Sequence, residues 1–322
     1  MRDAGARWRG FVRDAALAAS LALAAGVSAI LATDPLWIWQ ERPPWLAWTG
    51  GVNRLLDAEM RRAKPLQLFG RPAGTLLVGS SVVYRGLDPA LVRDGAYNLG
   101  LSSLMADELP DVARLAAARG AQTVLIGLDY FMFSAFPGPP RLPTGLEAPA
   151  SRLAASLHVA LSLRTLAGAA PFVLARAYEG GAWQADGFKT TPDYGSAATL
   201  AIAADQRFGD MAYRPATLAH LRAALAILAG RDVRLYLSPM SRPQRRLADT
   251  AGRGPELADW RADVAAVARE AGVALLDLVD APGLDDFDPA RGSSAFWFDN
   301  LHFKPAVGRM VLARLGIATR DR

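Results

Sequence analysis

Two short segments at opposite ends of the chain contain residue types that can carry out nucleophilic chemistry. Gly79-Ser80-Ser81 follows an apolar run, and Asp299-Asn300-Leu301-His302 lies near the C-terminus. A serine hydroxyl becomes a nucleophile when a histidine removes its proton, and a carboxylate can hold that imidazole in the required tautomer. Ser81, His302 and Asp299 are therefore a candidate catalytic set for acyl transfer, provided that folding brings the two segments together.

The histidines narrow the choice of base, because the chain has only three of them. His158 and His220 each lie in an Ala/Leu-rich stretch of helical character, where an ordinary surface or core-edge position is expected. His302 alone follows a carboxylate by three residues in a polar and aromatic loop. Each segment also has an ordinary interpretation, since Gly-Ser-Ser is a common turn and Asp299 could cap a helix that starts at Pro305.

Composition limits the other chemistry that the chain can perform. Its 322 residues are 52% hydrophobic, which predicts a large core in one main domain with additions. The absence of cysteine excludes disulfides, thiolate chemistry and Cys-ligated metals. The net charge is +5, but the arginines are scattered, so nucleic-acid binding is not expected. The one dense acidic patch, Asp285-Asp286-Phe287-Asp288, is interpreted as a solvated loop, and neither a metal nor a cofactor is expected.

The N-terminal segment is predicted to cross a membrane. Ala15–Thr33 contains no charge and, as a helix, is nearly long enough to span the hydrocarbon core. Basic residues dominate before it and acidic residues follow it, which places residues 1–14 in the cytoplasm and the rest of the chain outside the inner (cytoplasmic) membrane, on the periplasmic side. Residues 15–33 are thus expected to be a single-pass signal anchor. A cleaved secretory signal ending near Val27-Ser28-Ala29 is the alternative, and it would export the domain equally.

Residues 34–64 are predicted to form a stalk at the membrane interface. Tryptophan favours the headgroup region, and four of the eight tryptophans follow the span at Trp37, Trp39, Trp45 and Trp48. Gly50–Lys64 has the pattern of a short amphipathic helix, acting as a stalk or brace. The globular domain is then expected to occupy residues 65–322.

That domain is predicted to be α/β, with a central parallel sheet covered by helices on both faces. Short apolar runs alternate with helical patterns, as in parallel sheets. The predicted strands are Thr75–Gly79, Ala96–Leu99, Thr123–Leu128, Val233–Leu237 and Val273–Leu278, and the predicted helices are Leu104–Arg119, Arg214–Ala229, Glu256–Ala271 and Pro305–Leu315. Sites in such sheets form at the carboxyl ends of the strands.

An insertion at about residues 136–213 interrupts the alternation. Phe136-Pro137-Gly138-Pro139-Pro140 breaks the chain, and Ser151–Tyr178 has helical character. Gly180–Gly195 is loop-like and is expected to expose its aromatic residues. Two interpretations of the insertion have equal weight: its loop forms a lid or substrate wall, or the insertion is a helical hairpin with a long surface loop.

The order of the motifs resembles that of the SGNH/GDSL hydrolase superfamily. Gly79-Ser80-Ser81-Val82, Tyr97-Asn98-Leu99-Gly100 and Asp299-Asn300-Leu301-His302-Phe303 match three of its blocks, over about Gly74 to Leu315. The resemblance implies a flavodoxin-like three-layer domain with Ser81 as nucleophile, His302 as base and Asp299 as its partner. It also implies an oxyanion hole to which the Gly100 amide contributes. The amides of Ser81 and Gly100, or the side chain of Asn98, could replace the asparagine donor that the superfamily has in a further block and this chain lacks.

Two positions depart from the superfamily pattern. Ser80 stands where an aspartate usually precedes the nucleophile, although the spacing still favours Ser81 as the reactive serine. Gly127-Leu128-Asp129-Tyr130 stands where the pattern has Gly-x-Asn-Asp, and an ionised Asp129 cannot donate a hydrogen bond to an oxyanion. Ser80 and Asp129 are therefore candidates for positioning a substrate hydroxyl or a loop, and Asp129 could equally cap the end of a strand.

Within the superfamily, an anchored exported domain with Gly-Ser-Ser resembles the branch that acylates cell-envelope polymers, as in alginate O-acetylation and teichoic acid D-alanylation. This implies a serine esterase or O-acyltransferase that acts on an envelope polysaccharide through an acyl-serine intermediate, with a membrane-bound acyltransferase as a possible partner. The alternative is a catalytically inactive binding or assembly protein of an acylation or export complex.

Overall fold

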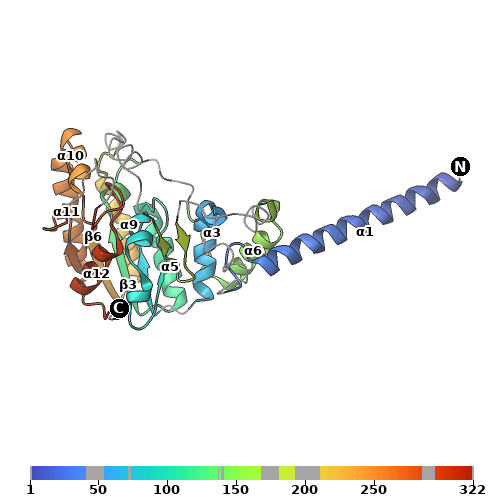
Figure 1. The fold of residues 1–322 in the computed structure, drawn as a ribbon, viewed down its shortest axis with the longest axis horizontal. Helices are drawn as coiled ribbons and strands as arrows, with labels where there is room; N and C mark the ends of the chain where they lie inside the picture. The colour runs from blue at the N-terminus through green and yellow to red at the C-terminus, as the bar shows by residue number, and fades with distance from the viewer. Residues whose placement is uncertain are drawn as a thin grey trace.

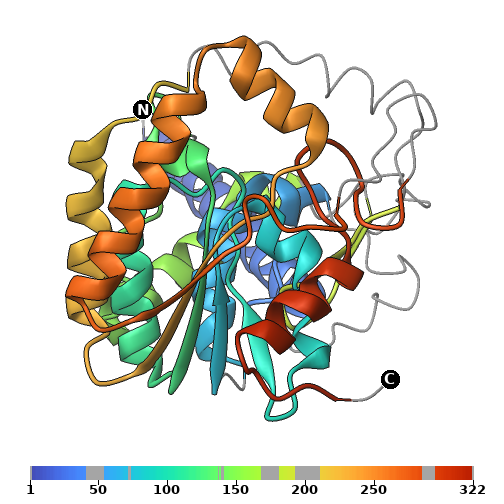
Figure 2. The ribbon, with the colours of Figure 1, turned by 90° about the vertical axis from the view of Figure 1, so that its left-hand side faces the viewer.

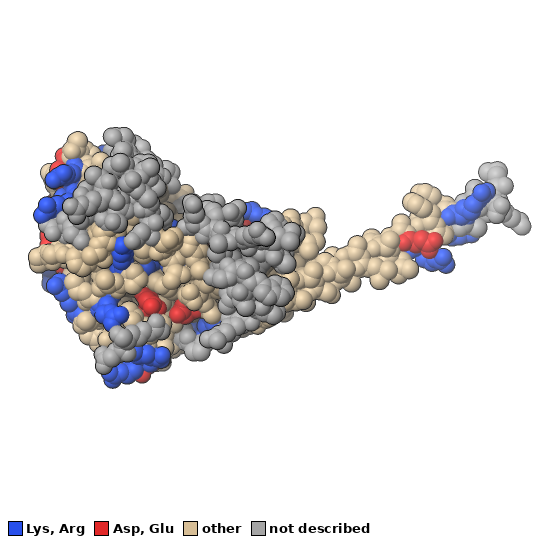
Figure 3. Space-filling model, viewed as in Figure 1, with Lys and Arg blue, Asp and Glu red and all other residues tan. Residues whose placement is uncertain are grey.

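The N-terminal helix stands apart from a layered domain in the computed structural model, which describes residues 2–40, 54–71, 74–136, 138, 141–167, 181–192, 211–284 and 294–320. Helix α1 (Arg2–Thr33) projects from the domain as a long rod (Figure 1). Among the described residues it is the one helix apolar and long enough to cross a membrane, over Arg7–Thr33, and its most apolar stretch of 18 residues has a mean hydropathy of 2.1. Charged side chains gather at its far end, and the shaft between them and the domain is uncharged (Figure 3). The predicted apolar segment is thus present as a candidate membrane span.

The predicted central parallel sheet is confirmed. Its five strands lie in the order β2-β1-β3-β6-β7, and every neighbouring pair is parallel. The strands are β1 (Thr75–Val78), β2 (Ala96–Asn98), β3 (Thr123–Leu128), β6 (Asp232–Leu237) and β7 (Ala274–Asp277). Their carboxyl ends therefore meet at a single edge, where the segments that follow β1, β2 and β3 come together.

Helices cover both faces of the sheet (Figure 2). Alternate strand residues point to opposite sides, so Leu76 and Val78 join one apolar core while Leu77 joins the other. The first core includes residues of α5 (Leu109–Arg119), α9 (Leu218–Ile227) and α11 (Gly254–Glu270); the second includes residues of α4 (Ser81–Gly86) and α12 (Pro305–Arg314). The remaining elements of the domain are α10 (Arg242–Thr250) and the 3-10 turns η1 (Pro89–Leu91), η2 (Ala106–Glu108), η3 (Tyr130–Phe133) and η5 (Pro215–Thr217).

Helix α3 (Arg54–Phe69) belongs to the domain rather than to a separate stalk. It runs through Pro65, where the domain was expected to begin, and packs against α5. Leu56, Met60 and Ala63 are buried in the first core, because their spacing places them on one face of the helix. The amphipathic pattern was therefore read correctly as a helix, but its apolar face is covered by the sheet's own helical layer.

The segment after α1 is also held by the domain. Trp37 was expected at the membrane interface, but its side chain is 1% exposed and lies in the first core. Asp34 accepts hydrogen bonds from the amides of Ile38, Trp39 and Gln40, which turns the chain at the end of α1. Trp39 remains 39% exposed, and Trp45 and Trp48 lie outside the described residues.

The described parts of the insertion include a helix, a small hairpin and a helical stretch at residues 163–167. The helix is α6 (Pro149–Ala160), and the hairpin is the antiparallel pair β4 (Ala182–Trp183) and β5 (Lys189–Thr190). Trp183 and Phe188 were expected to be exposed, but they are 1% and 4% exposed because the hairpin packs against the domain. Trp183 lies against Tyr84 of α4, with 5.2 Å between ring centroids. The hairpin thus supports the start of α4 from outside. The acidic patch at residues 285–288 lies outside the described residues.

Candidate active site

The turn between β1 and α4 places Ser81 at the carboxyl edge of the sheet. Gly79 has a φ of +153°, and a side chain there would overlap Val83 and approach the Gly127 carbonyl oxygen to 2.9 Å. Glycine tolerates both the conformation and the contact. Ser80 then caps α4 by accepting a hydrogen bond from the Val82 amide, and Ser81 becomes the first residue of the helix.

The loop that carries His302 is ordered by its own aspartate. Oδ1 of Asp299 accepts hydrogen bonds from the Leu301 and His302 amides, each at 2.7 Å. The Phe298 amide donates to the His302 carbonyl oxygen at 2.8 Å, which closes the loop. Asp299 therefore fixes the backbone that presents the imidazole as well as contacting the imidazole itself.

Ser81, His302 and Asp299 form one continuous chain of short contacts. Nε2 of His302 lies 2.8 Å from Oγ of Ser81, and Nδ1 lies 2.7 Å from Oδ2 of Asp299. The structure thus brings together the three residues selected from the sequence, from positions 221 residues apart. The other two histidines lie elsewhere, with His158 exposed on α6 and His220 partly buried on α9.

The charge state of Asp299 suits this arrangement. Its side chain is 1% exposed, and burial by itself would raise the pKa of the carboxyl. The adjacent His302, through its charge and its hydrogen bonds, and the Leu301 amide outweigh that burial and lower the pKa. An ionised Asp299 keeps the proton of the imidazole on Nδ1, so Nε2 is free to accept the proton of Ser81.

Two glycines allow close packing between α4, which begins with Ser81, and α12, which follows the His302 loop. A side chain at Gly308 of α12 would overlap the carbonyl group of Gly86 in α4. A side chain at Gly86 would overlap the ring of Phe303, the residue after His302. Gly308 therefore allows α12 to approach α4, and Gly86 allows Phe303 to lie against α4. The pair was not recognised in the sequence, because neither glycine lies in a turn.

Asn98 and Gly100 have a different task from the one expected. Asn98 is fully buried, and its Nδ2 donates to the carbonyl oxygens of Val83 and Leu87 at 3.0 and 2.8 Å. Its Oδ1 accepts the Gly100 amide at 2.9 Å. Both predicted oxyanion donors are therefore engaged in fastening the 98–100 loop to α4. The Ser81 amide, a helix-start group, makes no hydrogen bond within the described residues and is available to an oxyanion.

Lys64 holds the same loop from the opposite side, and the sequence did not single it out. The side chain is fully buried, and Nζ donates to the carbonyl oxygens of Asn98 and Gly100 at 3.0 and 2.7 Å. The ammonium also lies 5.1 Å from the ring centre of Tyr84 and 4.9 Å from that of Trp183. A signal was present, because Lys64 follows Met60 by four residues and so shares its apolar helix face.

The pH dependence of stability provides a test of this buried lysine. Burial lowers the pKa of Lys64 in the folded protein well below 10.5, its ordinary value in the unfolded chain. At a pH between the lowered pKa and 10.5, the unfolded chain therefore binds more protons than the folded one. The free energy of unfolding should then rise with pH from the lowered pKa up to 10.5. Urea unfolding at a series of pH values should show that Lys64→Met loses much of this rise. Lys304→Met is the matched control and should keep it; an unchanged slope in Lys64→Met would mean that the ammonium stays charged when buried.

Ser80 and Asp129 lie together beside the triad. Ser80 is fully buried and Asp129 is 6% exposed at the end of β3. Burial raises the pKa of Asp129, although the nearby hydroxyls of Ser238 and Ser80 and the charge of His302 oppose the rise. Oδ2 of Asp129 has no hydrogen-bond partner within the described parts of the chain. It borders a small cavity of about 10 Å³, room for about one water, which Leu301 also lines.

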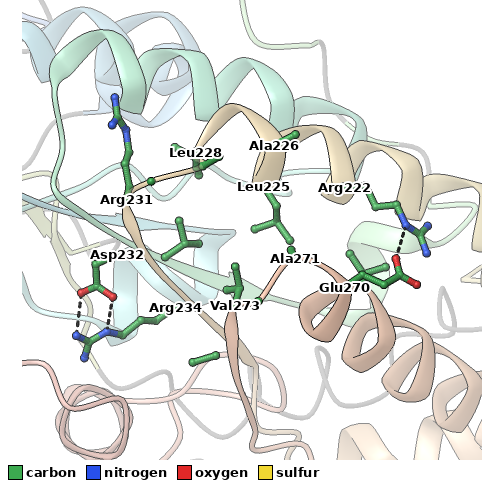
Figure 4. A pocket seen from close by; sticks show the side chains of 16 residues that line it. Arg222, Leu225, Ala226, Leu228, Arg231, Asp232, Arg234, Glu270, Ala271 and Val273 are labelled. Carbon is green, nitrogen blue, oxygen red and sulfur yellow. Dashed lines mark hydrogen bonds and ion pairs between the residues drawn. The ribbon is translucent and has the colours of Figure 1, made fainter.

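A larger cavity, of about 720 Å³, lies at the amino-terminal edge of the sheet (Figure 4). The start of β6, the turn before β7 and the helices α9 and α11 line it, with ion pairs between Arg222 and Glu270 and between Asp232 and Arg234. Its walls carry no serine, threonine, histidine or lysine, and its carboxylates Asp232 and Glu270 are held in ion pairs. The chemistry-bearing residues are therefore at the other edge of the sheet.

Any function assigned to the site depends on the geometry of the triad formed by Ser81, His302 and Asp299. The three side chains come from β1–α4 and from the loop before α12, which are the positions that the motifs predicted. Comparison of the chain with models of known protein families, with curated proteins and with solved structures finds no match.

Proposed function

We propose that this protein is a membrane-anchored serine esterase or O-acyltransferase with an SGNH-like active site. The observation that carries the proposal is the unbroken contact chain from Ser81 through His302 to Asp299. The three groups have the separations, and Asp299 has the lowered pKa, that favour nucleophilic acyl transfer.

The reaction follows from these positions. Oγ of Ser81 attacks the carbonyl carbon of an ester while Nε2 of His302 takes the hydroxyl proton. The tetrahedral intermediate collapses, and the departing alkoxide takes that proton from His302 and leaves as an alcohol, so Ser81 carries the acyl group. Water or a sugar hydroxyl then gives its proton to His302 and attacks the acyl-serine. The bond between the acyl carbon and Oγ of Ser81 breaks, Oγ takes that proton from His302, and the acid or the new ester is released. Asp299 stabilises the imidazolium in both halves.

Few hydrogen-bond donors in the described residues are positioned and free to stabilise the developing oxyanion. Among the described residues the Ser81 amide makes no hydrogen bond, whereas the Gly100 amide is bound by Asn98, whose own amide group binds Val83 and Leu87. Loss of one donor typically lowers an acyl-transfer rate by about 10² to 10³. The proposed enzyme is therefore slow toward simple esters, and its proper substrate supplies or releases a further donor.

The anchor and the substrate form the second part of the proposal. Helix α1 is a candidate membrane span, and its arginines precede the apolar stretch, which favours an extracytoplasmic domain. An O-acylated envelope polysaccharide is then the acyl acceptor or donor within reach, and a membrane-bound acyltransferase is the partner that could load Ser81.

The second candidate function is a non-catalytic binding or assembly protein with the same fold. The engaged Asn98 and Gly100 favour it, since a site without catalysis needs no free oxyanion donor. Both candidates share the anchor, so they differ only in whether Ser81 is activated.

Covalent labelling distinguishes the two. The full chain in detergent is treated with a fluorophosphonate, and the adduct is located by peptide mass spectrometry. We expect the adduct on Ser81, none in Ser81→Ala, and retention in Ser80→Ala, which loses a helix cap worth about 1 kcal/mol and a hydroxyl near Asp129 but leaves Ser81, His302 and Asp299 in place. A folded wild-type protein that takes no adduct would exclude the enzyme working alone and leave the binding role.

A further inference from the structure

An apolar stripe on α6 faces outward although the domain has a large core to receive it. Leu153, Leu157 and Leu161 are 62%, 52% and 56% exposed, and their spacing of four residues places them on one side of the helix. Leu163 extends the stripe and is 81% exposed. Residues 153–163 contain no Asp, Glu, Lys or Arg. Contiguous exposed leucines of this kind mark an interaction surface.

The stripe lies next to the candidate membrane span. α6 packs against α1, at the end of α1 that meets the domain (Figure 1). Leu166, just after the stripe, lies 3.4 Å from the position that a side-chain carbon on Gly26 would take. Ile30, one turn further along α1, is 2% exposed. One face of the last two turns of α1 therefore contacts the domain beside this helix, while Leu31 on another face remains 44% exposed.

The length of α1 fixes the depth of that contact. From Ala15, where the uncharged stretch begins, to Gly26 the helix rises only about 18 Å. A hydrocarbon core is about 30 Å thick. If the uncharged stretch crosses the bilayer, the hydrocarbon must continue past Gly26, alongside the part of the domain that contacts it.

We propose that α6 and the turn that follows it lie in the leaflet on the domain side of the bilayer, with Leu153, Leu157, Leu161 and Leu163 among the lipid chains. Lipid is the occupant that the surface fits, because the stripe is uncharged and continuous with a helix that itself spans. The domain is thereby held in one orientation to the membrane by two elements. This inference rests on the membrane-anchor part of the proposed function and not on the chemistry of Ser81.

The absence of cysteine makes single-site labelling direct. The full chain carries one cysteine with the environment-sensitive dye NBD, and it is reconstituted in phosphatidylcholine vesicles with or without nitroxide-labelled lipid. The test position is Leu157→Cys, the positive control is Leu21→Cys on the exposed face of α1, and the matched negative control is Ala223→Cys, an exposed position of α9 outside the large cavity. We expect blue-shifted emission and loss of most fluorescence to the nitroxide lipid at positions 157 and 21, and neither effect at 223.

The possible outcomes distinguish the lipid contact of α6 from the membrane anchor and from the chemistry of Ser81. Quenching at position 21 without quenching at 157 would overturn the inference and leave the anchor intact. A blue shift at 157 that the nitroxide lipid does not quench would show that protein covers the stripe, which also overturns it. No quenching at either position would reject the anchor itself. Fluorophosphonate labelling of Ser81 in the same variants reports on the active site independently.

Discussion

Asp299→Asn is expected to slow acylation of Ser81 by about four orders of magnitude. The asparagine carbonyl can still accept the Leu301 and His302 amides, so the loop keeps its shape. Its amino group, however, would face Nδ1 of His302 and place the imidazole proton on Nε2. That nitrogen could no longer accept the proton of Ser81, which lies 2.8 Å away. The measurement is the second-order rate of fluorophosphonate labelling, with circular dichroism to confirm folding.

Two further variants give the reference rates for this measurement: His302→Ala, which removes the base, and Asp88→Asn, which should leave the rate unchanged. Removal of the base is expected to lower the rate by about 10⁶. Asp88 is the matched control, because it too accepts a backbone amide, that of Ala90, and contacts no histidine. Asp88→Asn should therefore label at the wild-type rate. A rate for Asp299→Asn within tenfold of the control would show that the carboxylate does not orient the imidazole.

The sheet could be predicted because its signal is local. Each strand is a short apolar run that ends near glycine or a polar residue, and burial on both faces removes any need for alternation, as the fully buried Thr75–Val78 shows. Ser81, His302 and Asp299 could be predicted because few residue types perform their chemistry and the chain has only three histidines.

The helices that were missed lack such a signal. Helix α10 buries only Ala248 and places only Leu247 beside it against the first core, so its apolar pattern is too short to recognise. Helix α4 has six residues, and Val82-Val83 within it has the composition of a strand. Short or polar elements like these are stabilised by their tertiary neighbours rather than by their own periodicity.

The residues that hold the loop beside the site could not be predicted from the sequence for a related reason. Asn98 has the right amide group for an oxyanion, and only the fold shows that Val83 and Leu87 take its hydrogens. Lys64 reads as a charged residue near a helix end, yet it is fully buried between Asn98, Gly100 and two aromatic rings. Residue type indicates what a side chain can do; its partners depend on contacts distant in sequence.

Gly308→Ala should show how strongly the site depends on helix packing. Inside α12, alanine by itself would favour the helix by about 1 kcal/mol. The new methyl group would overlap the backbone carbonyl of Gly86, which cannot move without α4. Overpacking of this kind destabilises by about 1 to 3 kcal/mol, so we expect a net loss of stability in urea unfolding. Because α4 begins with Ser81, a displacement of about 1 Å would also reduce the labelling rate by about 10².

Gly254→Ala is the matched control for that experiment, since Gly254 also lies in a helix, α11, and its new methyl group would make an ordinary 3.5 Å contact with Asp249. It should leave both stability and the labelling rate close to wild type. The diagnostic feature of Gly308→Ala is that both quantities fall together, because the same contact between α4 and α12 holds the fold and sets the distance from Ser81 to His302. A variant that lost stability but labelled normally would show that the His302 loop keeps its place without α12, and that the two glycines serve packing alone.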